Sequence, residues 1–318
     1  MPALLIWTER TGTNTLTSQR VVVICGVDTH ADIHVAAACD HLGGVLATKS
    51  FATTAAGYRL LLTFLRSFGQ LREVGVEGTG SYGAGLARYL TEQAVSVVEV
   101  NRPNRQARRA HGKDDVIDAI AAARAVISGQ ATVTPKTHDG PVEALRVLQT
   151  VHRSARKART QAPNLPHALV LTAPDPIRDQ LRALANPALV TTCAGYRPTP
   201  GDDLNSITKL GLRELAVRVR DLDAQIHRLQ TRRHALVRAT APALLAIYGV
   251  GPDTATALLL AAGDNPHRLT SERSYAALLG ASPIKASFGK TNRHRLNRGG
   301  DRQGNSALWT IVMSRMAN

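Results

Sequence analysis

The chain has 318 residues, 44% of them apolar but only 4% aromatic, and its 39 Lys and Arg outnumber 24 Asp and Glu, a formal charge of +15. This length suits two domains, or three with a linker, and this charge predicts a polyanionic partner such as nucleic acid. A membrane partner is not expected, because no run approaches the roughly 18 apolar residues of a membrane span and Glu9 and Arg10 interrupt the apolar start of the chain.

The beginning of the chain and its cysteines indicate a cytoplasmic protein with a loose leader. Residues 1–20 are polar and rich in Thr, which is typical of a poorly ordered terminus. Cys25, Cys39 and Cys193 are odd in number and far apart in the sequence. We therefore expect free thiols of a reducing compartment rather than a disulfide or zinc framework.

Three strands are predicted in quick succession after the leader. Val21–Asp28 is a continuous apolar, β-branched run and predicts a buried strand. Further strands are expected at 33–39 and, after a Gly-Gly hairpin signal, at 45–52. The short connections favour antiparallel pairing of the three.

Helices and strands then alternate. We expect a helix at 55–69, a short strand at 73–78, a helix at 81–94, a strand at 95–100, and a helix headed by "HGKDDVIDA". A three-strand meander followed by such alternation matches the ribonuclease-H-like fold. The sequence therefore predicts an α/β domain of this class over residues 21–135.

Four acids in this domain are expected to meet. Asp28 ends the first predicted strand and Glu77 the fourth, while Asp115 and Asp118 share one face of the last helix. In this fold the first and fourth strands are neighbours and the last helix packs beside them. Clustered carboxylates repel one another unless hard cations such as Mg²⁺ bind them. Two such ions can activate an attacking oxygen and stabilise a leaving one in phosphoryl transfer.

Each acid also has a plain structural explanation. Acids in a first helical turn favour the helix dipole by about 0.3–1 kcal/mol each, and one of them can be an N-cap. Asp32 lies beyond the strand end, where a turn is expected. Asp114 suits a cap, but spacing alone leaves Asp114 and Asp115 interchangeable as metal ligands.

A basic segment precedes the last helix of this domain and contains no acid. Beside a site that handles phosphates, it favours a nucleic-acid contact surface over a solvated basic face. Its cations are Arg102, Arg105, Arg108, Arg109 and Lys113.

The middle of the chain, 136–240, predicts a helical linker and a coiled-coil arm. Residues 141–160 predict a basic helix, and the proline-rich stretch 163–202 predicts loops with short helices. A heptad seam follows, that is, a row of apolar residues at alternating spacings of three and four, if Arg233 is accepted at one of its positions. The seam can pack against 141–160 or between chains, and we favour dimerisation. Its apolar members are Leu212, Leu215, Val219, Leu222, Ile226, Leu229 and Leu236.

Residues 241–318 predict a mainly α-helical C-terminal domain. Two apolar helices flank Gly249 and Gly251 within 244–263, a helix-hairpin-helix pattern whose backbone N–H groups can face a DNA phosphate. A flexible basic loop follows and contains Ser287, although a lone serine in a loop ordinarily has no catalytic role. The cations of this loop are Lys285, Lys290, Arg293, Arg295, Arg298 and Arg302.

Taken together, the motifs resemble the DEDD-type transposases of the IS110 family of bacterial insertion sequences. They stand as "GVDTHADIH", "VEGTGSYG", "GKDDVIDA", "GVGPDTA" and "GASPIKASFGKTNRHRLNRGGDRQGN", spread over nearly the whole chain. The resemblance implies a RuvC-like N-terminal domain that holds Mg²⁺, or Mn²⁺ in its place, and a nucleophilic serine at Ser287. It also implies which acids bind the metal, namely Asp28, Glu77, Asp115 and Asp118.

The resemblance further implies partners. Related enzymes act on the ends of the element and on target DNA, use a structured RNA that the element encodes, and assemble as dimers or tetramers in which acids and serine come from different subunits. A bacterial cytoplasmic, nucleoid-associated protein is therefore expected.

The chain departs from the family pattern in three places. Phe288 stands where the family usually has Ser or Thr, and so can crowd the serine. The prolines of "QAPNLPHALV" predict a kinked or broken arm. The chain stops at Asn318, where relatives continue, which predicts a shortened copy.

The sequence thus predicts a DNA transposase or recombinase, with two rival functions. A ribonuclease-H-like nuclease or junction resolvase would use metal-activated water and leave free ends. An inactive copy would only bind nucleic acid, with a steep salt dependence.

Overall fold

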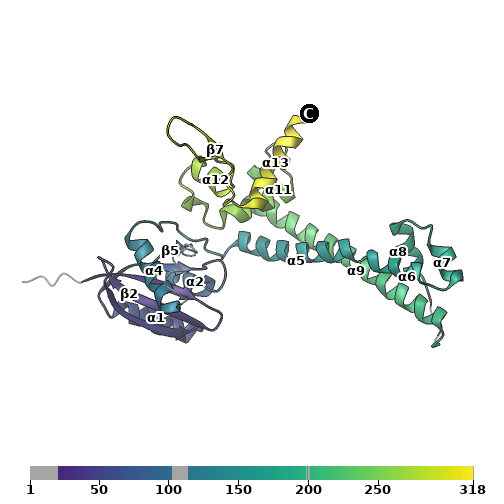
Figure 1. Cartoon of the computed structure of the whole chain (residues 1–318), viewed down its shortest axis with the longest axis horizontal. Helices are drawn as coiled ribbons and strands as arrows, with labels where there is room; N and C mark the ends of the chain where they lie inside the picture. The colour runs from purple at the N-terminus through teal and green to yellow at the C-terminus, as the bar shows by residue number, and fades with distance from the viewer. Residues whose placement is uncertain (1–20, 102–113, 198, 200, 318) are drawn as a thin grey trace, which may run out of the picture. The chain divides into compact units, whose positions relative to one another are not determined.

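The computed structural model describes residues 21–101, 114–197, 199 and 201–317. The chain divides into two compact units, Met1–Pro135 and Lys136–Asn318 (Figure 1). Each unit has its own hydrophobic cores. In the described part of the chain, no helix combines the length and apolar character that crossing a bilayer requires.

The first unit is built on a five-stranded mixed sheet of order β3-β2-β1-β4-β5. β1 pairs antiparallel with β2, which pairs antiparallel with β3, whereas β4 is parallel to both β1 and β5. The predicted meander and alternation are therefore present, and the sheet fits a ribonuclease-H-like domain. The strands are β1 (Val22–Thr29), β2 (Ile33–Asp40), β3 (Val45–Ala52), β4 (Gln70–Glu77) and β5 (Ser96–Val100).

Three helices cover the two faces of this sheet. Alternate residues of β1, among them Val23 and Val27, pack in one core with leucines of α1 (Ala55–Arg66) and α2 (Ala84–Glu92). Ile24 faces the other way and packs with Ala122 and Val126 of α4 (Asp115–Ile127). Among the described helices, the period-two pattern of β1 thus places α4 against the face that carries the acids.

The second unit contains two long helices that pack along each other, α5 (Pro141–Gln161) and α9 (Leu204–Thr240). Three short helices stand between them in the sequence, α6 (Asn164–Leu171), α7 (Asp175–Leu181) and α8 (Asn186–Ala194), as the proline-rich stretch predicts. They form a small core against the first half of α9.

The predicted seam lies on α9 and is partly used within the chain. Leu212 and Val219 are fully buried, while the other seam leucines and Ile226 are half-buried. Arg233, the polar member, is only 2% exposed and reaches Gln149 and His152 of α5 and Asp253. Arg233 therefore fixes the packing of helices inside the unit, and pairing of the seam between chains stays a prediction.

The last part of the unit contains α10 (Pro242–Leu245), α11 (Pro252–Ala262), a 3₁₀ turn η1 (Pro266–Arg268), α12 (Glu272–Leu278) and α13 (Arg302–Met316). The first of the two helices expected around Gly249 is α10, which ends at Leu245. Turn-type hydrogen bonds from Ile247 to Leu244 and from Val250 to Ile247 replace its last helical turn. Gly249, at φ 84°, then reverses the chain before α11.

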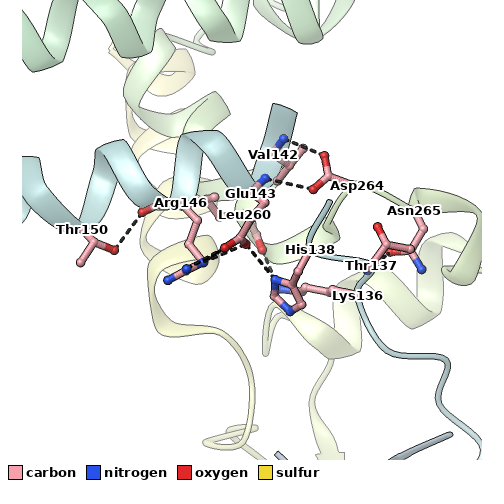
Figure 2. Close-up of polar contacts among 10 residues, drawn as sticks. All are labelled: Lys136, Thr137, His138, Val142, Glu143, Arg146, Thr150, Leu260, Asp264 and Asn265. Carbon is pink, nitrogen blue, oxygen red and sulfur yellow. Dashed lines mark hydrogen bonds and ion pairs between the residues drawn. The ribbon is translucent and has the colours of Figure 1, made fainter. Parts of the chain in front are cut away.

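A polar network fastens the segment before α5 to the end of α11 (Figure 2). The Asp264 carboxylate accepts hydrogen bonds from the backbone N–H groups of Val142 and Glu143 at 2.7 and 3.0 Å. Lys136 Nζ donates to the Leu260 carbonyl at 2.6 Å. A carboxylate from another segment therefore caps the N-terminus of α5, where the helix's own N-cap, Gly140, offers no side chain.

Replacing Asp264 with alanine is expected to loosen this helix start by about 1–2 kcal/mol, since two N–H groups lose their acceptor. Amide hydrogen exchange in the first turn of α5 should accelerate about tenfold or more. Asp139→Ala removes an exposed acid beside the same helix start and serves as the control. Equal exchange in both variants would contradict the capping role.

Candidate active site

Two of the four predicted acids lie on adjacent parallel strands. Val27 of β1 is in register with Val76 of β4, and the acids Asp28 and Glu77 follow these residues. Both are buried, at 4% and 8% exposure. Glu77 ends β4 as predicted, whereas β1 continues one residue past Asp28 to Thr29, whose hydroxyl donates to the Glu77 carbonyl at 2.8 Å.

Glycines two residues before each acid let α4 approach the sheet closely. A Cβ at Gly26 would lie 2.1 Å from the Ala119 carbonyl oxygen and 2.3 Å from the Ala123 nitrogen. A Cβ at Gly75 would lie 2.8 Å from Val126 Cγ2. Main chain thus lies against main chain, and the first turn of α4 is held beside the strand ends that carry the acids.

A methyl group at Gly26 is therefore expected to destabilise the first unit by about 3 kcal/mol or more, because backbone rather than a flexible side chain must move. Gly26→Ala should lower the unfolding temperature of the first unit. Gly211→Ala on α9 is the control, since its new methyl would meet only Leu169 Cδ1 at 3.9 Å. An unchanged unfolding temperature in Gly26→Ala would contradict the close approach.

The aspartates at the start of α4 have separate roles. Asp114 is the N-cap, and its side chain accepts a hydrogen bond from the Val116 N–H at 2.9 Å. Asp115 is the first helical residue and Asp118 is buried at 5% exposure. Hence the structure uses Asp114 as the cap and leaves Asp115 to face the strand end.

The charge environment of Asp28 includes two acids of α4. Burial raises the pKa of the Asp28 carboxyl, and the nearby Asp118 and Asp115 raise it further, against the lowering effect of His30. Asp32, by contrast, is exposed in the turn, where its carbonyl accepts from Thr53 N–H at 2.9 Å. Asp28 and Asp115 therefore lie close together, with Asp118 near enough to act on Asp28, and a metal-binding role for all four acids stays a prediction.

His30 is a member of this cluster that the sequence did not single out. Its Nε2 lies 3.0 Å from Asp28 Oδ2 and 3.2 Å from Asp115 Oδ1. One ligand atom from each of Asp28, His30 and Asp115 can be chosen so that all three lie within 4.8 Å of one another. Carboxylate oxygens with an imidazole nitrogen form a donor set that suits a divalent cation.

Ser287 lies in the second unit, in a hairpin formed by β6 (Ile284–Lys285) and β7 (His294–Arg295) rather than in the flexible loop that was expected. Its Oγ donates to Asn292 Oδ1 at 2.9 Å. Phe288 pairs with Thr291 across the tip. The Phe288 side chain is 90% exposed, and Ser287 is exposed as well.

The hairpin and its flanks carry the predicted basic residues. All six cations are exposed, and within the described residues none forms an ion pair with an acid. They remain available for phosphate groups: Lys285, Lys290, Arg293, Arg295, Arg298 and Arg302.

The glycine turn is less open than predicted. The N–H of Gly251 donates to Thr254 Oγ1 at 3.0 Å, so this donor is used inside the chain. Gly249 lies against α13, where an added Cβ would be 3.2 Å from the Ile311 carbonyl oxygen. Phosphate binding by this turn stays a prediction. The basic residues Arg102, Arg105, Arg108, Arg109 and Lys113 lie outside the described residues.

Comparisons with known proteins agree with the motifs. Residues 25–173 match a DEDD-type IS110 transposase model, and residues 241–318 match the model of the transposase IS116/IS110/IS902 family. A stretch of 111 residues is 36% identical to a probable family 20 transposase of Pseudomonas aeruginosa, covering 34% of this chain and 32% of that protein. The aligned stretch thus spans about a third of the relative. The chain belongs to the IS110 family of transposases.

Proposed function

We propose that the protein is a recombinase that cuts and rejoins the DNA of an insertion sequence through metal-assisted attack of Ser287 on a phosphodiester. The observation that carries the proposal is the convergence of Asp28, Asp115 and Asp118 at one strand end, within a chain of the transposase family. A carboxylate cluster with a raised Asp28 pKa is unfavourable by itself and becomes favourable with a cation.

The acids would hold the metal. Asp28 and Asp115 have ligand oxygens within 4.8 Å of each other, and Glu77 and Asp118 are buried on β4 and α4. We assign Mg²⁺, with Mn²⁺ as a substitute, because all four supply hard oxygen donors. When bound, such an ion neutralises phosphate charge and activates the attacking oxygen.

Ser287 would be the nucleophile. Its hydroxyl is exposed on the hairpin and is oriented by the hydrogen bond to Asn292. In the proposed step the Ser287 Oγ–P bond forms, the bond from phosphorus to the leaving deoxyribose oxygen breaks, and the serine proton passes to that oxygen through solvent. The phosphoserine link keeps the phosphodiester count constant, so that reversal by another DNA end rejoins the strand.

The six cations of the hairpin region would hold the DNA backbone, since each is exposed and without an acidic partner among the described residues. Binding should weaken steeply with salt, because each neutralised phosphate releases counterions. We further propose, from the family, a guide RNA encoded by the element and a dimer or tetramer in which acids and serine come from different copies.

The test uses wild-type protein, junction DNA of the element, its RNA and Mg²⁺ or Mn²⁺. Strand cleavage with a denaturation-resistant protein–DNA adduct is expected only when metal is present. Cleavage that leaves free ends and no adduct would instead establish a water-using nuclease or resolvase. Retention of DNA without cleavage in either ion would establish an inactive binding protein.

A further inference from the structure

We infer that His30 is an additional ligand of the metal centre and that its nitrogen makes the site bind Mn²⁺ in preference to Mg²⁺. The inference rests on the proposed function, because it concerns the same ion. It adds a residue to the four acids, and it predicts tighter binding of Mn²⁺ than the oxygen donors of the acids alone imply.

The distances around His30 are those of adjacent ligands on one ion. Nε2 lies 3.0 Å from Asp28 Oδ2 and 3.2 Å from Asp115 Oδ1. Two neighbouring ligands of an octahedral ion with bonds of about 2.1 Å are about 3 Å apart. A cation can therefore take the place of the bridging proton without a large movement of the three side chains.

The backbone fixes where His30 stands. The His30 N–H donates to the Ile33 carbonyl at 3.2 Å, closing the turn between β1 and β2. The preceding residue, Thr29, is tied to the Glu77 carbonyl of β4. The imidazole thus starts from a position bound to two strands, while its 40% exposed side chain leaves a route from solvent to the carboxylates.

His30 also differs from an ordinary surface histidine by its surroundings. Within the described residues, it is the only basic side chain paired with Asp28 or Asp115. If His30 only formed hydrogen bonds to the acids, the carboxylate oxygens alone would determine which cation the site prefers. A ligating imidazole instead favours Mn²⁺ and later divalent metals, which accept nitrogen ligands more readily than Mg²⁺ does.

The experiment compares the full-length wild type with His30→Gln and His41→Gln in the absence of DNA. His41 is an exposed histidine of the same unit, in the turn after β2, and serves as the matched control. Free Mn²⁺ is followed by electron paramagnetic resonance during titration, and pulsed resonance detects ¹⁴N coupling to the bound ion. Mg²⁺ binding is measured by its competition with Mn²⁺, and circular dichroism checks folding.

We expect wild type and His41→Gln to show ¹⁴N coupling and equal Mn²⁺ affinity. His30→Gln should lose the coupling and bind Mn²⁺ at least tenfold more weakly, with Mg²⁺ affinity changed less than threefold. If wild type binds Mn²⁺ without ¹⁴N coupling, and His30→Gln binds it with the same affinity as wild type, the role of His30 is overturned but the metal centre is left intact. Absence of bound Mn²⁺ in wild type would overturn both that role and the proposed metal chemistry.

Discussion

Ser287→Ala is expected to abolish covalent protein–DNA adducts while leaving DNA and RNA affinity within about twofold of wild type. The substitution removes only the hydroxyl that donates to Asn292, on a hairpin that is otherwise exposed. The six cations and the β6–β7 pairing remain, so nucleic-acid binding should persist. The measurement is the yield of adduct that survives denaturation, alongside binding by electrophoretic mobility shift.

Ser282→Ala provides the control, since this serine lies just before the hairpin, with its backbone bonded to Ala276. Its adduct yield should match that of wild type. An undiminished yield in Ser287→Ala would remove the serine from the mechanism. In that case metal-activated water, or another nucleophile, would have to break the strand.

Asp28→Asn is expected to lower metal-dependent strand cleavage at least about a hundredfold, because it removes a ligand charge at the strand end. The loss should not come from unfolding. Burial raises the pKa of Asp28 in the folded protein above its value in the unfolded chain. The free energy of unfolding therefore falls as pH rises from the unfolded-state pKa to the folded-state pKa of this carboxyl. Without metal at pH 7, the uncharged amide should therefore unfold at no lower temperature than wild type.

Asp32→Asn is the matched control for this prediction, four residues along and exposed in the turn. It should cleave DNA at the wild-type rate with the same metal dependence. Normal cleavage by Asp28→Asn would refute the assignment of the ion to this cluster. Cleavage lost together with a lower unfolding temperature would point to damage of the fold instead.

Much of the first unit was predictable because its strands are long and strongly patterned. β1 begins with an uninterrupted apolar run, residues 22–27, and such a run favours a buried strand. The predicted strand order placed Asp28 and Glu77 at the ends of neighbouring strands, and the structure has these strands paired in parallel. Spacing alone left Asp114 and Asp115 interchangeable, the family resemblance favoured Asp115 as the ligand, and the hydrogen bond from the Val116 N–H identifies Asp114 as the cap.

Other features could not be predicted for physical reasons. His30 lies past a strand end in a short turn, and its contact with Asp115 joins residues 85 apart in sequence, which no local pattern encodes. The β6–β7 hairpin pairs two residues on each strand, too short for periodicity, so its basic sequence resembled a loop. Arg233 is a charged residue in an otherwise apolar seam, and no local pattern shows its partners. In the structure it donates hydrogen bonds to Gln149 of α5 and Asp253 of α11.

The contact of α4 with Gly26 and Gly75 has a consequence for how activity can be lost. These positions have no functional group, yet they decide the spacing between helix and sheet to within the width of a methyl group. Random mutagenesis scored for transposition should therefore recover substitutions there alongside changes of the acids themselves. The packing of α4 against the strands that carry the acids thus depends on two residues without side chains.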